Sequence, residues 1–466
     1  MIRIDKIELN NFRFFVDETI NNSFEIEGED FLVYGENGSG KSSIFKAFDF
    51  LTKRDIPLAE FNKNINIFEN DNTYIEFSFT NEEILRIDCD HLSLGRDYPY
   101  ISTMSVVNPL LDYKNLLHIS YEKEENRGTD RKKNLYSFFE AILANYPISG
   151  NRVLSELEDE EYFENFKNII RNELFESINL FIDKFEQNFK LTNVEFSGFG
   201  RKVFLDIDYF DRPVEIFHNF LNEARLTALA ISIYLAIIKK QYDLLESDSL
   251  KILVLDDLLI SLDMNNRLRL IDVLKSEFSD FQIFFFTHDK ALFDIFKEKK
   301  EWKSYEIYVD NSGDFEKPFI KKSLNYFESA KKHFDEHDYP ACANYLRKEV
   351  ERIKKIVNQS EIDGVPVDRS IQIVKKLVNS NDFTNFSRPS STTNECIGRI
   401  RGKLIGIKNN LDNAREPSVE INIQEINGIL HRILHPQSHD DTSRPLYKKE
   451  LEEAIYIINR LRNRFL

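Results

Sequence analysis

Apolar residues in the first 310 positions follow two alternating patterns. Six short runs rich in Ile, Val, Phe and Tyr, several of which end in Gly, Asp or Thr-His, predict β-strands. Residues 154–189 instead carry apolar side chains at intervals of three and four, which predicts a long helix. This part of the chain is therefore expected to be α/β with a helical insertion over about residues 110–190. The strand-like runs are RIDKIEL (3–9), FLVYG (31–35), TYIEFSF (73–79), KVFLDIDYF (202–210), KILVLDD (251–257) and FQIFFFT (281–287).

The pattern changes after residues 310–314, which form the most turn-like stretch of the chain. Beyond this stretch strand-like runs nearly disappear, and residues 325–357 and 448–466 carry the apolar spacing of helices. Two domains are therefore expected, an α/β domain over residues 1–315 and an all-α domain over residues 320–466.

The net charge of −17 is unevenly distributed. Residues 321–466 hold 25 Lys and Arg against 20 Asp and Glu, a balance of +5, whereas residues 1–320 hold 37 against 59, a balance of −22. This asymmetry suggests two units with different partners. A mildly basic C-terminal unit is compatible with binding to nucleic acid, but a solvated helical surface would carry the same charge.

Cysteine content and hydropathy indicate the compartment. Cys89, Cys342 and Cys396 lie far apart and form no CxxC pair, which argues against a disulfide framework or a zinc knuckle. The N-terminal residues MIRIDKIELNNFRFF are charged throughout, and no run approaches the roughly 18 apolar residues of a membrane span. The chain is therefore expected to be cytoplasmic, neither exported nor embedded in a membrane.

A glycine-rich stretch, YGENGSGKSS (34–43), follows the run FLVY and precedes a helical run, which is the context that the GxxxxGK[ST] pattern requires. Its glycines let successive backbone N–H groups point at phosphate oxygens, and the helix N-terminus adds further donors. Lys41 would reach the β- and γ-phosphates of ATP, and Ser42 would offer its hydroxyl to Mg²⁺. The alternative is a glycine-rich turn without a ligand, although this pattern rarely arises by chance. The candidate phosphate-binding residues are Gly35, Asn37, Gly38, Ser39, Gly40, Lys41, Ser42 and Ser43.

A second candidate element is the run KILVLDD. Its apolar residues, Ile252 to Leu255, predict a buried strand that ends in two aspartates. Asp256 would hold Mg²⁺ through its water shell, and Asp257, one residue further and facing the γ-phosphate, would polarise the attacking water. The alternative interpretation is a charged strand end without a catalytic role.

The order of these elements resembles the ABC-class ATPases of the SMC, RecF and overcoming-lysogenization-defect group. The opening IRIDKIELNNFRFF and the following FLVYGENGSGKSSIFKAFDFL are similar to their N-terminal strand, Asn-Phe-Arg turn and P-loop, which implies that Arg13 lies near the nucleotide. LDDLLISLD is similar to their Walker B motif and D-loop, with Asp263 as the D-loop aspartate. FFFTHD ends in His288, at the position of the switch histidine that senses the γ-phosphate. The resemblance covers residues 1 to about 300 and implies an ABC-type P-loop NTPase head.

This family places a signature helix, LSGGQ or LSGGE followed by an alanine-rich run, between the P-loop and Walker B. The candidate here is LNEARLTALA (221–230), expected to be an amphipathic helix that Asn222 caps and whose first residues face the ATP of another subunit. Asn222 replaces the signature serine, Glu223 and Ala224 replace its glycines, and Arg225 replaces the usual Gln or Glu. Glu223 near a phosphate would repel it unless the carboxylate were paired.

Other departures concern the rest of the head. Where the family has a catalytic glutamate, this chain has the shorter Asp257, and the shorter side chain is expected to slow hydrolysis. No glutamine precedes Gln187, so the usual Q-loop residue is absent and LLDYKNLL near Asp112 is the candidate replacement. Only 179 residues separate Lys41 from Leu221, without a CxxC hook, which excludes an extended coiled-coil arm and implies a compact head nearer RecF in build.

The segment NGILHRILHPQSHDD (427–441) is another candidate for chemistry. It carries histidines at intervals of four, a spacing that could hold a metal on one helix face. Pro436 prevents such a helix from continuing, so packing at a helix end is the favoured interpretation. The histidines are His431, His435 and His439.

Arg432 and His439 also have the Arg-x6-His spacing of HEPN ribonucleases, in which the pair activates a ribose 2′-hydroxyl without metal. The spacing alone arises by chance in a chain of this composition. The preceding helical run YFESAKKHFDEHDYPACANYLRKEVERIKKI resembles the HEPN pattern, which implies a HEPN-like C-terminal domain with these two residues as the candidate RNase pair.

The resemblance implies an ATP-hydrolysing protein that uses ATP and Mg²⁺ and forms a homodimer or higher oligomer through its heads. Three functions stay open. The first is a sensor or regulator in bacterial anti-phage defence, which controls a nuclease or toxin encoded nearby as Septu-like or retron-associated ATPases do. The second is a RecF-like DNA repair ATPase. The third is an ATPase-gated HEPN ribonuclease that resembles anticodon nucleases.

Overall fold

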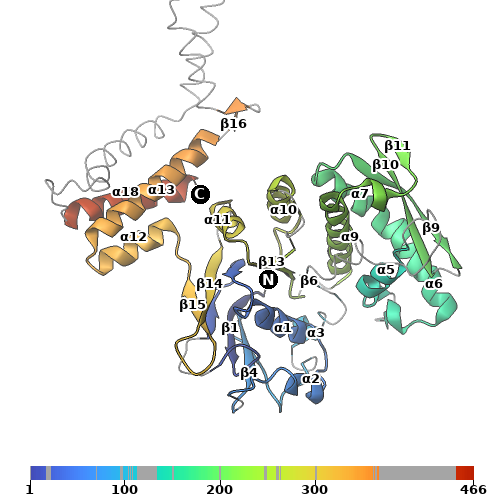
Figure 1. Ribbon diagram of the computed structural model, residues 1–466, viewed down its shortest axis with the longest axis horizontal. Helices are drawn as coiled ribbons and strands as arrows, with labels where there is room; N and C mark the ends of the chain where they lie inside the picture. Colours follow the sequence, from blue (N-terminus) through green and yellow to red (C-terminus); the bar gives the residue numbers. More distant parts are fainter. Residues whose placement is uncertain are drawn as a thin grey trace, which may run out of the picture. The chain divides into compact units, whose positions relative to one another are not determined.

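The structure is a computed structural model that divides into two compact units, residues 1–323 and 324–466 (Figure 1). The turn-like residues 310–314 lie inside the first unit, where they join two antiparallel strands of one sheet. The described residues are 2–16, 22–69, 71–94, 98–102, 104, 107, 109–112, 134–148, 152–198, 201–245, 249–258, 262, 264–299, 302–359, 361–362, 365–366 and 448–465.

The first unit confirms the α/β class that the sequence predicts. Its central sheet, as far as the chain is described, has six strands in the order β15-β14-β3-β13-β12-β6, and all but the edge strand β15 run parallel. The strands of this sheet are β3 (Phe31–Gly35), β6 (Leu110–Asp112), β12 (Ile252–Asp256), β13 (Gln282–Thr287), β14 (Lys303–Asp310) and β15 (Lys317–Lys322). Because parallel strands end at a common edge, residues that follow β3, β12 and β13 are brought together there.

Smaller antiparallel sheets accompany the central one. The orders are β2-β1-β4-β5, β11-β10-β9 and β7-β8. Their strands are β1 (Ile4–Asn10), β2 (Ser23–Glu25), β4 (Tyr74–Phe79), β5 (Ile84–Ile87), β7 (Pro147–Ile148), β8 (Arg152–Val153), β9 (Phe189–Ser197), β10 (Lys202–Tyr209) and β11 (Arg212–Val214).

Aromatic packing fixes the first helix against the central sheet. Phe48 on α1 (Lys41–Leu51) packs on Phe284 of β13 with ring centroids 4.5 Å apart, and Phe31 of β3 meets Phe286 of β13 edge to face. Such pairs each add about 0.5–1.5 kcal/mol beyond the burial of their area. The helix that follows the glycine-rich stretch is therefore held in place by a dry core. The other helices around this half of the unit are α2 (Leu58–Asn62), α3 (Pro99–Ser102), α10 (Met264–Glu277) and α11 (Lys290–Lys299).

The insertion is helical, but it differs in detail from the prediction. The expected single helix over residues 154–189 is a short 3-10 turn, η2 (Leu154–Glu156), followed by consecutive helical segments that end at Lys184. The middle segment, η3 (Ile169–Leu174), is a π-helix, and Phe189 already belongs to β9. The remaining helices of the region are α5 (Tyr136–Leu143), α6 (Asp159–Asn168), α7 (Phe175–Lys184) and α8 (Phe217–Phe220).

The helix predicted from LNEARLTALA is α9 (Glu223–Asp243), and Asn222 caps it as predicted by accepting a hydrogen bond from Arg225 N at 3.0 Å. The prediction that α9 is amphipathic was wrong, because every residue from Leu226 to Ile238 is buried. A helix that is apolar on all sides belongs in a core. It packs against α5, α7 and η3, so helices of the insertion bury part of its surface (Figure 1).

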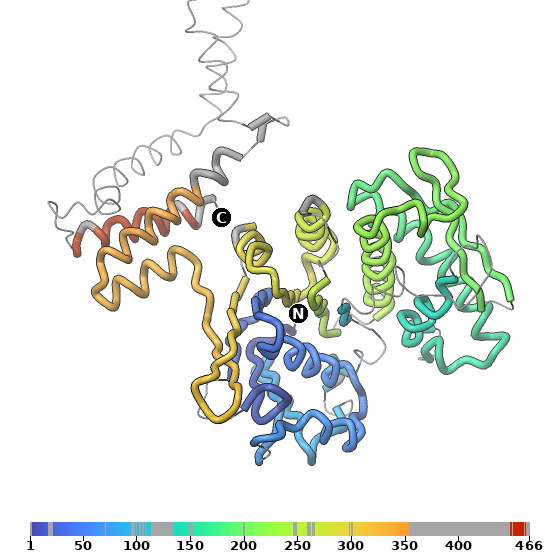
Figure 2. Tube along the Cα trace, viewed as in Figure 1, coloured from blue at the N-terminus to red at the C-terminus, as the bar shows by residue number. Residues whose placement is uncertain are grey.

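The second unit contains a helical bundle in which two consecutive helices pack with one that lies far from them in the sequence. Its helices are α12 (Tyr326–Asp335), α13 (Tyr339–Gln359) and α18 (Lys448–Phe465), with a short antiparallel pair, β16 (Glu361–Ile362) and β17 (Val365–Pro366). Figure 2 shows α18, at the red end of the chain, beside α12 and α13. Asn325 and Glu328 form a capping box at the start of α12.

At the centre of this bundle the Glu349 carboxylate is fully buried. Arg352 donates two hydrogen bonds to it, at 2.8 and 3.0 Å, and Arg462 of α18 donates a third at 3.1 Å. Arg462 also donates to Asn325 Oδ1 at 3.1 Å. The buried charge is thereby paired by two arginines, and one of them ties the last helix to the first two.

Candidate nucleotide site

The glycine-rich stretch makes a tight turn between β3 and α1. Gly38 and Gly40 have φ of 87° and 109°, values that L side chains adopt at a cost. At Gly35 a Cβ would lie 2.3 Å from Ser39 Oγ, so no larger residue fits. Gly40 is the N-cap of α1, no side chain caps that helix, and its first turn holds no acidic residue. The helix N-terminus is thus suited to an anion.

Lys41 is buried at the start of α1, with 6% of its side chain exposed. Its Nζ donates to Gly35 O at 2.5 Å and Glu36 O at 3.3 Å, and lies 3.8 Å from Asp257 Oδ2. Burial lowers the pKa of Lys41, and the charges of Asp257 and Asp256 offset part of that effect. The backbone carbonyls that hold this ammonium are weak partners, which phosphate oxygens could replace.

The residues around Lys41 suit a nucleotide phosphate and Mg²⁺. Ser39 Oγ is fully buried without a hydrogen-bond partner, directly beside the backbone of the turn. Ser42 is exposed, whereas Ser43 is buried and its Oγ accepts a hydrogen bond from Phe14 N at 3.4 Å. Ser42 and Asp256 supply the oxygen donors that Mg²⁺ prefers. Asp256 pairs in register with Asp112 of β6, so the proposed Q-loop replacement begins at the same sheet edge.

Asp257 directly follows β12 in a left-handed conformation, with φ of 50°. Its N–H donates to Phe286 O at 3.0 Å, which ties the end of β12 to β13. Its Oδ1 accepts hydrogen bonds from the backbone N of His288 at 2.9 Å and from Nδ1 of the same residue at 2.7 Å. Because a carboxylate can only accept, this contact requires the proton on Nδ1, which leaves Nε2 available to a ligand.

A cavity of about 100 Å³ opens beside this pair. Such a volume has room for a few water molecules. The structure therefore brings Asp257 and His288 together beside a space that water can enter, although the two lie far apart in the sequence. Lys41 Nζ lies 3.8 Å from the other oxygen of Asp257. The cavity is lined by Asp257, Leu258, Arg267, Phe285, Thr287, His288, Asp289 and Leu292.

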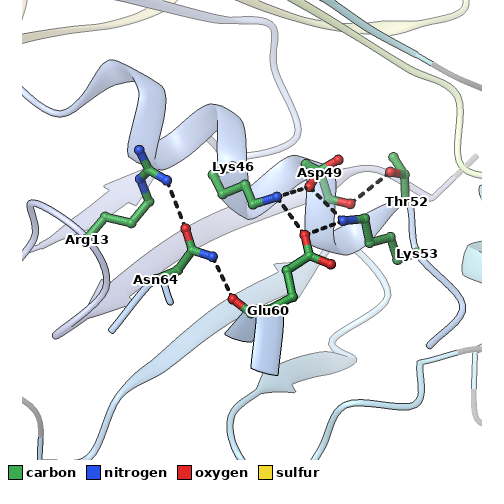
Figure 3. Close-up of polar contacts among 7 residues, drawn as sticks. All are labelled: Arg13, Lys46, Asp49, Thr52, Lys53, Glu60 and Asn64. Carbon is green, nitrogen blue, oxygen red and sulfur yellow. Dashed lines mark hydrogen bonds and ion pairs between the residues drawn. The ribbon is translucent and has the colours of Figure 1, made fainter. Parts of the chain in front are cut away.

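Arg13 lies in the loop after β1, with φ of 54°. Its guanidinium donates to Asn64 Oδ1 at 2.8 Å (Figure 3). The next two residues, Phe14 and Phe15, contact the glycine-rich turn, since a Cβ at Gly40 would meet their rings at 3.0 and 3.2 Å. Arg13 is thus close in sequence to residues that contact the turn, while its own side chain contacts Asn64.

The residues at the start of α9 form a separate group. Asn222 caps the helix through Arg225 N, and the Arg225 guanidinium lies over the ring of Tyr209 at 5.0 Å from its centroid. Tyr209 also packs against two exposed aromatic residues, Phe210 and Phe220, with ring centroids 4.8 and 5.1 Å away. Glu223 is exposed in the first turn. Among the described residues, no hydrogen bond, ion pair or ring contact joins this group to the glycine-rich turn.

Several predicted residues lie outside the described part of the chain. These are the D-loop candidate Asp263, the RNase pair Arg432 and His439, and the histidines His431 and His435. Within the described residues, no three His, Cys, Asp or Glu side chains gather in a way that could hold a metal ion. No described helix is long and apolar enough to cross a membrane.

Sequence reasoning missed Arg267 and Asp289, which border the cavity. Arg267 Nη1 donates to Asp289 Oδ2 at 2.6 Å, and Arg267 Nε donates to Leu262 O at 2.8 Å. Asp289 directly follows His288, so its position in FFFTHD was visible, but its partner 22 residues earlier was not. Burial would raise the pKa of Asp289, but hydrogen bonds from Leu292 N and Arg267 outweigh burial and lower it.

A parallel α/β sheet, a glycine turn before a helix and a buried lysine facing two strand-end aspartates together characterise P-loop nucleotide-binding proteins. The chain is similar to the DNA double-strand break repair Rad50 ATPase of Sulfolobus acidocaldarius, with 29% identity over 175 residues. The match covers 37% of this chain and 18% of the relative, so it spans less than a fifth of that protein's length. No protein-family model matches the chain.

Solved structures to which the chain is similar include SMC head domains. The SMC head bound to the C-terminal winged-helix domain of ScpA is 12% identical, with 70% of this chain and 99% of that chain covered at a TM-score of 0.44. A head with an extended coiled coil bound to a ScpA domain from Pyrococcus furiosus is 14% identical, with 72% and 100% covered at 0.43. The head from Thermotoga maritima is 13% identical, with 69% and 100% covered at 0.35.

Proposed function

We propose that this protein binds and hydrolyses ATP as an SMC/RecF-like ABC ATPase. The observation that carries the proposal is the convergence of buried Lys41 with the Asp257–His288 pair beside a glycine turn that leaves a helix N-terminus uncapped. Lysine and backbone N–H groups bind phosphate oxygens, and a carboxylate with an adjacent histidine serves to orient water and sense charge.

Each group has a separate role in this proposal. Lys41 exchanges its backbone carbonyls for the β- and γ-phosphate oxygens, and Ser42 and Asp256 hold Mg²⁺, which neutralises charge on the phosphates. Asp257 orients the attacking water from the cavity side. His288 donates a hydrogen bond from Nδ1 to Asp257, which leaves Nε2 to face the γ-phosphate and to respond to its presence.

The active form in this proposal is a dimer that closes around two nucleotides. The start of α9, with Asn222, Glu223 and Arg225, would face the ATP bound by the other subunit, and Asp263 would act at the same interface. The support is the cap geometry of Asn222 and the place of α9 in the motif order. ATP binding then favours the closed dimer through its higher affinity for that state, and hydrolysis releases it.

Nucleotide binding and turnover by the purified full-length chain test the ATPase. Lys41→Ala should weaken ATP binding by about 100-fold or more, because charge-assisted hydrogen bonds to phosphate are lost. Asp257→Asn should retain binding, lower turnover by about 100-fold or more and accumulate an ATP-bound dimer on size-exclusion chromatography. Lys46→Ala is the matched control, since Lys46 lies on the same helix but pairs with Asp49 and Glu60. Unchanged turnover in both site variants would refute the assignment.

The cellular role that we propose is regulation of a nuclease or toxin encoded nearby in bacterial anti-phage defence. Its support is the resemblance of the motif order to defence ATPases. DNA repair is the second candidate, because the similar curated protein is a break-repair ATPase. A third is an ATPase-gated ribonuclease, which would use Arg432 and His439 and bind RNA through the C-terminal unit.

Cell survival distinguishes these roles. A defence regulator, expressed with its neighbouring genes, should protect cells against phage in a Lys41-dependent manner, whereas a repair ATPase should protect them against DNA breaks. Arg432→Ala or His439→Ala should abolish toxicity if the chain itself is the ribonuclease, and leave toxicity intact if a separate effector acts.

A further inference from the structure

Arg267, on the first turn of α10, joins two loops that border the candidate site. Its Nε donates to Leu262 O at 2.8 Å, in the segment after β12, and its Nη1 donates to Asp289 Oδ2 at 2.6 Å, in the loop after β13. Its side chain is 16% exposed, so the two contacts are largely shielded from water. One guanidinium thus holds both chain segments that leave the neighbouring strands, and its planar fork suits it to do so.

Asp289, which Arg267 holds, in turn fixes the backbone next to His288. Its other carboxylate oxygen accepts a hydrogen bond from Leu292 N at 3.1 Å, in the first turn of α11, and its own N–H donates to Thr287 Oγ1 at 3.1 Å. His288 lies between these two anchored residues. Its backbone is therefore held from both sides, which fixes the direction in which the imidazole leaves the chain.

The imidazole in turn meets Asp257, the carboxylate proposed to orient the attacking water. Both the backbone N and Nδ1 of His288 donate to a single oxygen of that carboxylate, and the other oxygen faces Lys41 Nζ at 3.8 Å. A continuous set of contacts runs from Leu262 through Arg267, Asp289 and His288 to Asp257. Arg267 and Asp289 also line the cavity on which His288 and Asp257 open.

We infer that Arg267 is a positioning residue for ATP hydrolysis, which acts through Asp289 to align the His288–Asp257 pair. The inference rests on the proposed ATPase function and adds Arg267, which the motif pattern does not contain. A misplacement of about 1 Å in a catalytic group lowers the rate of a reaction by as much as about 100-fold. Arg267 touches none of the phosphate-binding residues in the described contacts, so its loss should affect turnover and leave nucleotide affinity unchanged.

The test is steady-state turnover and ATP binding of full-length Arg267→Ala, Arg267→Lys and Asp289→Asn. We expect kcat to fall by about 10- to 100-fold for Arg267→Ala, with the Kd for ATP within about twofold of wild type. Arg267→Lys should recover only part of the loss, since one ammonium cannot reproduce the fork geometry. Arg269→Ala is the matched control, because Arg269 on the same helix pairs with Glu186 instead and its removal should leave kcat unchanged.

A double-mutant cycle decides whether Arg267 acts through His288. Arg267→Ala combined with His288→Ala should be no slower than His288→Ala alone, because the positioned group is already gone. Multiplicative losses, an unchanged kcat for Arg267→Ala, or an equal loss in Arg269→Ala would each overturn the inference. Absence of ATP turnover in the wild-type chain would instead refute the proposed function itself, so the two failures are distinguishable.

Discussion

Both units bury a charged side chain, but they satisfy it differently. Lys41 in the first unit is held by two backbone carbonyls and by a carboxylate 3.8 Å away that also pairs with His288. Glu349 in the second unit accepts three hydrogen bonds from two arginines at 2.8–3.1 Å. The comparison suggests that a buried charge with weak neutral partners is prepared for a ligand, whereas one that arginines already saturate holds helices together.

The largest expected effect on stability is at Glu349, whose carboxylate already accepts hydrogen bonds from two arginines. Glu349→Ala should destabilise the second unit by about 3–5 kcal/mol, because two partly buried arginines lose their shared counter-ion. Scanning calorimetry of the full-length chain would detect an earlier unfolding transition. Glu351→Ala, on the same helix and paired with Arg347 at an exposed position, is the control and should cost less than about 1 kcal/mol. An equal effect of both variants would break the comparison.

The opposite effect on stability is expected at Lys41, the buried charge whose backbone partners a ligand can replace. Lys41→Met should stabilise the nucleotide-free protein by about 1 kcal/mol, because it removes a charge that is costly to bury. Burial places the pKa of Lys41 in the folded state below its unfolded value, so the cost of burying the charged form is fully present below the folded pKa and is lost as pH rises from the folded to the unfolded pKa. The advantage of the variant should therefore shrink at alkaline pH. Thermal unfolding with and without ATP measures both effects, and stabilisation of the variant by ATP would contradict the role of Lys41.

The smallest effect is expected where paired charges are only partly buried. Lys46, Lys53, Asp49 and Glu60 form an ion-pair network between α1 with its following turn and α2 (Figure 3). Hydrogen bonds from Lys46 and Lys53 lower the pKa of Glu60. Its stabilisation is therefore present above the unfolded pKa and is lost as pH falls through the folded pKa.

Glu60→Gln should accordingly cost less than about 1 kcal/mol at neutral pH, with no difference from wild type in acid. Thermal midpoints across a pH series would show this convergence. A cost as large as that of Glu349→Ala would mean that pairing alone, without burial, accounts for the stability of such clusters.

The sequence predicted the parts of the fold that local patterns specify. Continuous apolar runs marked β3, β12 and β13, since strands buried on both faces carry few polar residues. The strands β14 and β15 were missed because their many charged and polar residues obscure the alternation. The all-round burial of α9 was already indicated by residues 226–238, where only Thr227 and Ser232 are polar, but the first ten residues of the segment do not reveal it.

The residues of the candidate site also fall into two groups, those that a local motif predicts and those that only the fold brings together. The glycine turn and Lys41 were identifiable because their spacing along the chain is itself the geometry. The bond between Asp257 and His288 joins residues 31 positions apart, and the pair formed by Arg267 and Asp289 spans 22. Both contacts depend on β12 and β13 lying side by side, which the parallel pairing of the sheet provides and no short motif states.

The left-handed backbone of Asp257 bears on which side chains can stand there. At a φ of 50° most L residues are strained, and Asp and Asn are enriched because their short side chains hydrogen-bond locally to the backbone. The same conformation does not exclude the longer acid, since Glu27, Glu82 and Glu186 adopt φ of 58°, 68° and 47° in this chain. An exchange of Asp257 for glutamate is therefore open to this turn, and its consequences would come from the length of the side chain rather than from the backbone.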